Sequence, residues 1–248
     1  MRSIVKNKNT YYVLGILFIF VLWGFGNAYF ENDVIVPDIG QTFISLFKLL
    51  GEFRTYFILG HTLFRLILVM GVSLILGILL AGLSKISYHF KAFIKPLMSL
   101  LKTLPIAVLI ILLIIMFSDN ALYYIVGVVI LPIIYEATIN GLDSIDQNIV
   151  DEVKMLSNTN FTVIKNIYLP LTAPFVLTSL IQSFGLGLKV LVMAEFISNT
   201  RNSIGYEIIL YRDDYNDMSY VYAWSIILIL FVLVIDFIID ILKKKILV

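Results

Sequence analysis

Residues 145–170 read IDQNIVDEVKMLSNTNFTVIKNIYLP, a polar insert between two long apolar stretches. Its first half carries apolar residues at helical spacing, namely Ile149, Val150, Val153 and Leu156. This spacing predicts an amphipathic helix of about two turns. Asn158-Thr159-Asn160 then breaks the helix, and a second short helix is predicted over 161–167. We therefore expect residues 142–168 to form a structured insert between two apolar segments.

The apolar segments around this insert dominate the composition. Of the 248 residues, 60% are hydrophobic and 14% are charged, and the mean hydropathy is +0.97. A soluble domain of this size cannot bury so much apolar surface in one core, which excludes disorder, a nucleic-acid-binding protein and a conventional soluble enzyme. A membrane-spanning helix needs ~20 mostly apolar residues. Six stretches qualify, at about 11–30, 57–83, 96–117, 121–141, 169–194 and 220–242. The sequence thus predicts an all-α integral membrane protein of six transmembrane helices, with residues 1–248 as one domain.

Basic residues orient these spans. If the chain starts in the cytoplasm, the cytoplasmic segments hold Arg2, Lys6, Lys8, Lys85, Lys91, Lys95, Lys154, Lys165, Lys243, Lys244 and Lys245. The external segments hold only Lys48, Arg54, Arg201 and Arg212. By the positive-inside rule, both termini and the insert are cytoplasmic. The N-terminal apolar run could also be a signal peptide, but its length and Trp23 near its end favour a retained span.

The sequence lacks the residues and motifs that several kinds of chemistry require. The chain has no cysteine and only two histidines, His61 and His89, so thiolate chemistry and an H-E-x-x-H zinc site are excluded. It also lacks the G-x-x-x-x-G-K-[ST] phosphate loop and the G-x-S-x-G element of serine hydrolases. An intramembrane enzyme is therefore the weakest functional class, and no cofactor is expected to bind this chain.

The insert resembles the cytoplasmic EAA motif of permease subunits of bacterial ABC importers: E-A-A, three residues, Gly, nine residues, then I-x-L-P. Here the spacing falls on Asp151-Glu152-Val153, Ser157 and Ile167-Tyr168-Leu169-Pro170. The spacing and the I-x-L-P end match, whereas the opening and the glycine are replaced. Over Thr62 to Leu242 the chain is similar to the nitrate/sulfonate/taurine-type permeases, in stretches such as Leu101-Lys102-Thr103-Leu104-Pro105, Met193-Ala194-Glu195 and Ile204-Gly205-Tyr206.

This resemblance implies a fold, partners and a location. The fold is a type I ABC importer permease, with a coupling helix in the insert between spans four and five. The implied partners are a second copy of the chain as a homodimer, cytoplasmic ATPase subunits that bind ATP and Mg, and an extracytoplasmic solute-binding protein. The location is the bacterial cytoplasmic membrane, in a lipid bilayer and with no nucleic acid. The chain itself would be a transport subunit without an ATP site, carrying a small, often anionic solute or a vitamin precursor by alternating access.

The resemblance also assigns a coupling role to residues of the insert. Leu156 and Phe161 would be apolar anchors on the ATPase, while Asp151, Glu152 and Lys154 would set the register and Ser157 takes the glycine position. The alternative is an amphipathic helix that lies on lipid headgroups. Such a helix usually has a polar face rich in Lys and Arg, whereas acidic residues equal or exceed basic ones here, so the docking role is favoured.

Four ionisable residues fall at membrane depth: Arg65, Lys102, Glu136 and Lys189. Charges there are costly and need a partner or a water-lined path. Lys102 and Glu136 both belong to the inner half, so an ion pair between them is expected. Arg65 and Lys189 both belong to the outer half, with Glu195 as the obvious acidic neighbour.

Two interpretations of Arg65 and Lys189 stay open. As an unbalanced positive pair they would attract an anion, and as snorkelling side chains they would reach the outer interface. Gln182 and Ser183, deeper in the fifth span, are candidates for a polar contact with solute near the midplane. The predicted solute pathway therefore holds Arg65, Gln182, Ser183, Lys189 and Glu195.

Other features concern packing and alternatives. Small residues repeat every four positions in two spans, as Ser73, Gly77 and Ala81 and as Ser179, Ser183 and Gly187, which predicts close helix contacts. Residues 41–56 predict a short external amphipathic helix, and 204–219 a second external element. The alternative function is a partner-free secondary transporter or channel. The structured insert and the lack of an internal repeat disfavour it.

Overall fold

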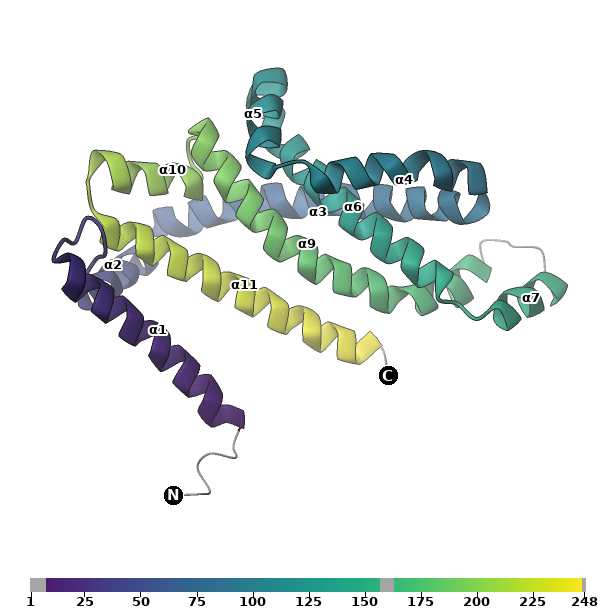
Figure 1. The fold of residues 1–248 in the computed structure, drawn as a ribbon, viewed down its shortest axis with the longest axis horizontal. Helices are drawn as coiled ribbons and strands as arrows, with labels where there is room; N and C mark the ends of the chain where they lie inside the picture. The colour runs from purple at the N-terminus through teal and green to yellow at the C-terminus, as the bar shows by residue number, and fades with distance from the viewer. Residues whose placement is uncertain (1–7, 157–162, 247–248) are drawn as a thin grey trace.

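A computed structural model describes residues 8–156 and 163–246, and every regular element within them is helical. Figure 1 shows an elongated bundle. Its elements are α1 (Lys8–Phe30), α2 (Ile39–Gly51), α3 (Phe53–Ile86), α4 (Tyr88–Thr103), α5 (Ile106–Phe117), a 3₁₀ turn (Ser118–Asn120), α6 (Ala121–Asp143), α7 (Gln147–Leu156), a π-helical turn (Ile164–Tyr168), α9 (Leu169–Ser198), α10 (Ile204–Ile209), a second π-helical turn (Leu210–Asp214) and α11 (Met218–Ile246). We call the end near α7 the inner end and the end near α2 and α10 the outer end.

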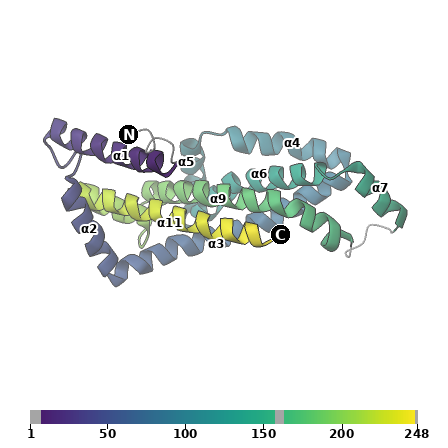
Figure 2. The same ribbon diagram turned by 90° about the horizontal axis from the view of Figure 1, so that it is seen from below.

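The core of the bundle lies between α3, α6 and α9, which run side by side in both views (Figures 1 and 2). The small-residue face of α3 is buried at its crossing with α6. A Cβ atom on Gly77 would lie 2.7 Å from Ile134 Cγ2 and 3.3 Å from the Tyr135 backbone nitrogen, so α6 approaches too closely there for a larger residue. The close packing predicted for Ser73, Gly77 and Ala81 is confirmed.

The prediction of an all-helical membrane protein is confirmed. Among the described residues, five helices are long and apolar enough to span a bilayer, and a bent pair of helices makes up to six. The third predicted span, 96–117, is wrong as a continuous helix. It consists of α4 and α5, which meet at an angle of 103°. The break lies at Leu104-Pro105, because proline has no N–H for the helix and restrains the preceding residue to an extended conformation.

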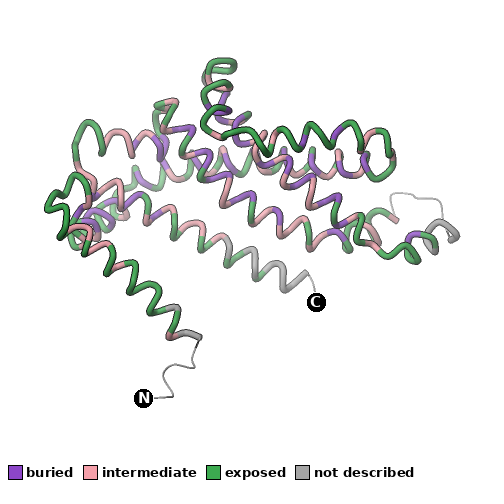
Figure 3. The backbone as a smooth tube through the Cα atoms, viewed as in Figure 1, coloured by how far each residue is buried: buried purple, intermediate pink, exposed green. Residues whose placement is uncertain are grey.

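One external segment differs from its predicted boundaries. Residues 41–56 do not form one helix, because α2 ends at Gly51 and residues 53–56 already belong to α3. The Asp38 side chain caps α2 by accepting the Gln41 N–H at 2.9 Å. Helix α1 lies largely apart from the core, as its exposed colouring in Figure 3 shows. The outer end of α1 is attached to the segment before α2 through Trp23, whose indole N–H donates to the Pro37 carbonyl at 2.9 Å.

The described part of the insert between α6 and α9 is a short turn over 144–146, then helix α7, and a helical segment from Val163 onward. Helix α7 extends from the inner end of the bundle (Figure 1). The second predicted helix, 161–167, is described only from Val163, and this part is not separate, because it continues through the π-helical turn into α9. Pro170 supplies no N–H to the first turn of α9, and the wider π turn directly precedes this helix. The break predicted at 158–160 lies outside the described residues.

Candidate functional site

One face of α9 carries a stripe of residues spaced by four and three positions. The stripe consists of Thr178, Gln182, Gly185, Lys189 and Val192. Residues at this spacing lie on one side of an α-helix. Three adjoining hollows follow this side, and each is lined by members of the stripe.

The middle hollow has a volume of about 710 Å³ and is walled by α4, α6, α9 and α11. Its polar lining residues are Lys102, Glu136, Asn140, Gln182 and Lys189. The Lys102 ammonium is in ion-pair contact with the Glu136 carboxylate. Both side chains line this hollow and are partly exposed, at 44% and 39%. The two residues that sequence reasoning expected to neutralise each other thus lie together at one wall.

The other two hollows extend the middle one in both directions. The inner hollow, of about 440 Å³, shares Ala137, Asn140 and Gln182 with it and continues past Thr178 to Pro174. The outer hollow, of about 520 Å³, lies between α9 and α11 and shares Lys189 and Val232 with it. Together the three make a continuous depression along α9, which we call the α9 groove.

Lys189 stands where the middle and outer hollows join. Its side chain is exposed, and no acidic side chain that the structure describes, a set that leaves out Asp119, Glu152, Asp236 and Asp240, forms an ion pair with it. The sequence placed Lys189 in the outer half with Arg65. In the structure Lys189 lines the outer hollow and also the same middle hollow as Lys102 and Glu136.

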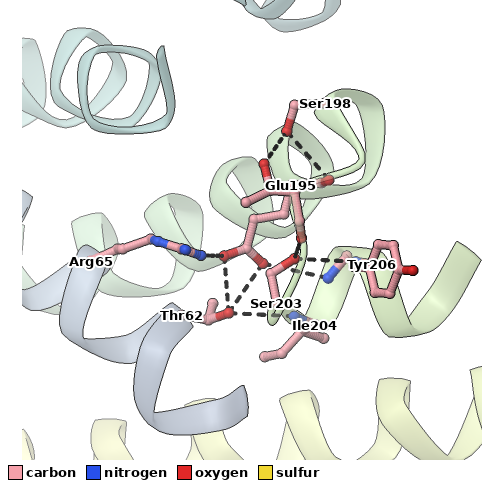
Figure 4. A network of polar contacts seen from close by, with 9 residues as sticks. Thr62, Arg65, Glu195, Ser198, Ser203, Ile204 and Tyr206 are labelled. Atoms are coloured by element: carbon pink, nitrogen blue, oxygen red, sulfur yellow. Dashed lines mark hydrogen bonds and ion pairs between the residues drawn. The ribbon is translucent and has the colours of Figure 1, made fainter. Parts of the chain in front are cut away.

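Arg65 belongs to a different site, a buried network that joins α3, α9 and α10 (Figure 4). Its Nη1 lies 3.0 Å from Glu195 Oε1, and the Glu195 side chain is fully buried. The same carboxylate accepts the Thr62 hydroxyl at 2.9 Å and the Gly205 N–H at 3.4 Å. Arg65 therefore neither pairs with Lys189 nor snorkels to the interface, and neither Arg65 nor Glu195 lines the α9 groove.

Ser183 also lies outside the α9 groove. It is fully buried, and its hydroxyl has no hydrogen-bond partner among the described residues. Neighbouring residues of a helix point about 100° apart, so Gln182 and Ser183, which the sequence grouped, face different surroundings. Sequence reasoning missed Asn140 and Thr178, which line the groove. The available signal was spacing, since each lies four residues from Glu136 or Gln182 on the same helix.

A second ion pair lies at the outer end, between the first turn of α3 and Glu207 of α10, which lies outside the spans. Arg54 Nη2 is 2.7 Å from Glu207 Oε1, and the Glu207 side chain is only 4% exposed. Burial raises the pKa of the Glu207 carboxyl, while the Arg54 charge opposes this rise. Burial, together with the Glu207 charge, raises the pKa of Tyr211 to about 12. The Tyr211 ring stacks on Tyr220, with centroids 4.3 Å apart.

The inner end shows where the predicted coupling residues lie. Asp151 on α7 is exposed and accepts a hydrogen bond from Gln147 Nε2 at 3.0 Å. Glu152, Lys154 and Leu156 belong to α7, but their side chains lie outside the described part, as do Ser157 and Phe161 entirely. Beside α7, two lysines hold the end of α6. Lys85 and Lys91 reach Asp143 at 3.0 and 2.6 Å.

Comparisons with known proteins agree with this architecture. The family model described as "Binding-protein-dependent transport system inner membrane component" matches residues 73–248. No curated protein is a significant sequence match.

Solved structures give fold matches. An inward-facing structure of the MetNI methionine ABC transporter aligns with a TM-score of 0.61 and 13% identity, covering 76% of this chain and 96% of that one. A chain of "an amino acid ABC transporter with histidines" aligns with a TM-score of 0.63 and 15% identity, covering 75% and 90%. At such identities the likeness shows a shared fold.

Proposed function

Since the chain belongs to the family of inner-membrane components of binding-protein-dependent transport systems, we propose that it is the membrane-spanning permease subunit of an ATP-driven importer, with the α9 groove as its half of the solute pathway. The observation that carries this proposal is the stripe on α9, whose members Thr178, Gln182 and Lys189 are polar, together with the depression that follows it along the helix. Polar and charged groups at membrane depth are costly unless they line a water-filled path or find a partner.

The polar groups that the α9 groove leaves uncovered support a homodimer. Lipid tails cannot hydrogen-bond Gln182 or Asn140, nor solvate the charge of Lys189. A second copy of the chain would cover these groups and close the pathway between two α9 helices. A likeness in the stretches around Leu104-Pro105 and Ile204-Gly205-Tyr206 supports the nitrate/sulfonate/taurine-type branch of the family.

Energy would come from separate cytoplasmic ATPase subunits that bind ATP and Mg, since the sequence carries no phosphate loop. We place their docking site at α7 and the residues after it. Leu156 and Phe161 would be the anchors, Asp151, Glu152 and Lys154 would set the register, and Ser157 takes the glycine position of the motif. An external solute-binding protein would deliver the solute. In this arrangement the chain lies in a bacterial cytoplasmic membrane with both termini in the cytoplasm, as its basic residues indicate.

The partner is tested by purifying the tagged chain from its native host and identifying the chains that accompany it. We expect a Walker-motif ATPase, lost on Leu156→Arg or Phe161→Asp. Asn148→Arg is the matched control, because Asn148 is exposed on α7 and lies off the apolar face. Uptake by the chain alone, with no ATPase, would instead identify a secondary transporter.

The pathway is tested by cysteine substitution, for which the cysteine-free sequence is suited. Thr178→Cys and Gln182→Cys should react with a charged thiol reagent in the assembled complex, at rates that change when ATP is added. Ser183→Cys, buried on another side of α9, and Leu230→Cys, an exposed position off the groove, should stay unreactive. Equal reactivity at all four positions would remove the groove from the pathway.

A further inference from the structure

A small cavity lies at the outer end of the bundle, where α2, α3, α10 and α11 meet. We call it the Trp224 cavity. Its volume is about 60 Å³, and it shares no lining residue with the α9 groove. Its lining is mostly polar, and the polar side chains are those of Glu52, Arg54, Thr55, Glu207, Tyr211, Tyr215 and Trp224. The cavity is therefore a site of its own, with its own chemistry.

Three polar groups in this lining lack a protein partner. The Trp224 side chain is fully buried, and its indole N–H meets no acceptor among the described residues. Thr55 is 1% exposed, and no described residue forms a hydrogen bond with its hydroxyl. Arg54 reaches Oε1 of Glu207 at 2.7 Å, and Oε2 has no donor in the described part of the chain. A buried polar group without a partner costs free energy, and here three of them line one space.

The nearest part of α11 without described side chains does not reach this cavity. On α11 the first such position is Asp236, about 18 Å along the helix from Trp224 at 1.5 Å per residue. The residues one turn from Trp224 on either side, Tyr220 and Leu228, are both described. The partner of the indole N–H is therefore to be sought inside the cavity.

The chemistry of the three groups selects the occupant. An indole N–H only donates and a carboxylate only accepts, whereas a hydroxyl does both. A cation cannot accept from the indole, and it would lie beside the Arg54 guanidinium. An anion would lie beside the carboxylates of Glu207 and Glu52. An apolar molecule would leave all three groups unpaired. A small neutral molecule that both donates and accepts is what remains.

We propose that the Trp224 cavity binds a cluster of about two ordered waters, which join Glu207 on α10 to Thr55 on α3 and Trp224 on α11. The volume sets this number, since a water molecule takes up ~30 Å³ in the liquid. Buried waters typically make about three hydrogen bonds each to polar groups that are otherwise unpaired. On its other side α10 contacts α9 directly, through the Gly205 N–H and the Glu195 carboxylate. Helix α10 is thus held by one direct and one water-mediated polar contact.

The test measures magnetisation transfer from water to the indole N–H, by proton-detected solid-state NMR on the full chain in lipid bilayers with isotope-labelled tryptophan. The sequence holds two tryptophans, so Trp23→Phe assigns the two indole signals. We expect transfer to the Trp224 indole at short mixing times, although this side chain is closed to bulk solvent. The Trp224 backbone N–H lies within the hydrogen-bonded turns of α11. It should receive none, and it serves as the internal control.

Thr55→Val removes one hydroxyl and keeps the shape of the side chain. Because a buried water then loses one of its hydrogen bonds, transfer to the Trp224 indole should fall roughly twofold. Thr42→Val is the matched control. Thr42 is also fully buried, but its hydroxyl donates to the Asp38 carbonyl at 2.8 Å and does not line the cavity, so transfer should stay unchanged. An unshifted Trp224 backbone signal in both variants shows that the fold is kept.

Three outcomes would overturn the inference. Absence of transfer to the Trp224 indole in the parent chain would show a dry cavity, and this measurement needs no variant. Equal transfer in Thr55→Val and the parent would show that the water does not bridge Thr55 and Trp224. A Trp224 indole signal that shifts when sodium or potassium ions are added at constant ionic strength would assign the cavity to a cation.

Discussion

Arg65 on α3 and Glu195 on α9 form an ion pair, with Nη1 3.0 Å from Oε1, around a carboxylate that is fully buried. Thr62 and the backbone of Gly205 bind the same carboxylate (Figure 4). One side chain therefore holds α3, α9 and α10 together at the outer end of the bundle.

Glu195→Gln should destabilise the protein strongly. The amide can still accept hydrogen bonds from Thr62 and Gly205, but the Arg65 side chain, only 16% exposed, loses its counter-charge. Removing one partner of a buried ion pair costs roughly 3–5 kcal/mol, and we expect about 3 kcal/mol here, since Arg65 keeps some exposure. Thermal unfolding of the purified protein in detergent measures the loss.

The double variant Arg65→Met/Glu195→Leu is the control, because it removes both charges and leaves neither unpaired. It should recover more than half of the lost stability. If Glu195→Gln proved as stable as the parent, the ion pair would not hold this junction.

Gly205→Ala should detach α10 from α9. A Cβ atom at this position would lie 2.3 Å from the Phe196 nitrogen and 2.6 Å from Glu195 Cβ. Because the first of these is a backbone atom, no side-chain rotation relieves the clash, and we expect a loss of about 2 kcal/mol, within the range for overpacking. Hydrogen exchange of the α10 amides should rise in parallel.

Gly71→Ala is the matched control for that variant. Gly71 lies within α3, and a Cβ atom there would meet nothing within 4 Å. Alanine in a helix interior is favoured over glycine by up to about 1 kcal/mol, so this variant should be neutral or stabilising. Equal losses at the two positions would refute the close approach at Gly205.

The spans could be predicted from the sequence because a bilayer requires runs of apolar residues of fixed length. The bend in the third span was missed because hydropathy carries no information on direction. The signal for it was Leu104-Pro105, since proline ends or bends a helix.

The site was only partly predictable, because the depth of a residue in the membrane does not determine the direction in which its side chain points around the helix axis. Lys189 and Glu195 share a depth range, but six residues on a helix correspond to a rotation of roughly 240°. Glu195 therefore faces Arg65 on α3, while Lys189 faces the groove. Which helix lies opposite each face depends on tertiary packing, which a single sequence does not state.

Asp143→Asn should cost far less than Glu195→Gln. Lys85 and Lys91 reach Asp143 at 3.0 and 2.6 Å, but all three side chains are 35–42% exposed. Exposed ion pairs typically contribute well under 1 kcal/mol and weaken with salt, so we expect a loss of about 0.5 kcal/mol that fades at high ionic strength. The same thermal unfolding measurement, repeated at low and high salt, checks this. A salt-independent loss as large as that of Glu195→Gln would mean that Asp143 is shielded from solvent in the assembled protein.

Glu207 should make stability fall as the pH rises. Burial raises the pKa of its carboxyl above the ordinary value of 4.5, with Arg54 opposing. The folded protein thus holds this proton more tightly than the unfolded chain does. The resulting stabilisation is complete below pH 4.5 and is lost as the pH rises through the raised pKa of the folded state.

Two variants separate this effect from other titrating groups. Glu207→Gln removes the carboxyl, so the unfolding temperature should become less dependent on pH in this window. Arg54→Met removes the charge that lowers the Glu207 pKa, so the decline should extend to higher pH, because the gap between the folded and unfolded pKa values widens. Asp213→Asn is the contrast, since Arg212 lowers the pKa of Asp213 and its contribution has the opposite sign. Unfolding temperatures of the parent and the three variants, measured from about pH 4 to about pH 8, test these expectations. An unchanged pH profile in Glu207→Gln would show that another group dominates the titration at the outer end.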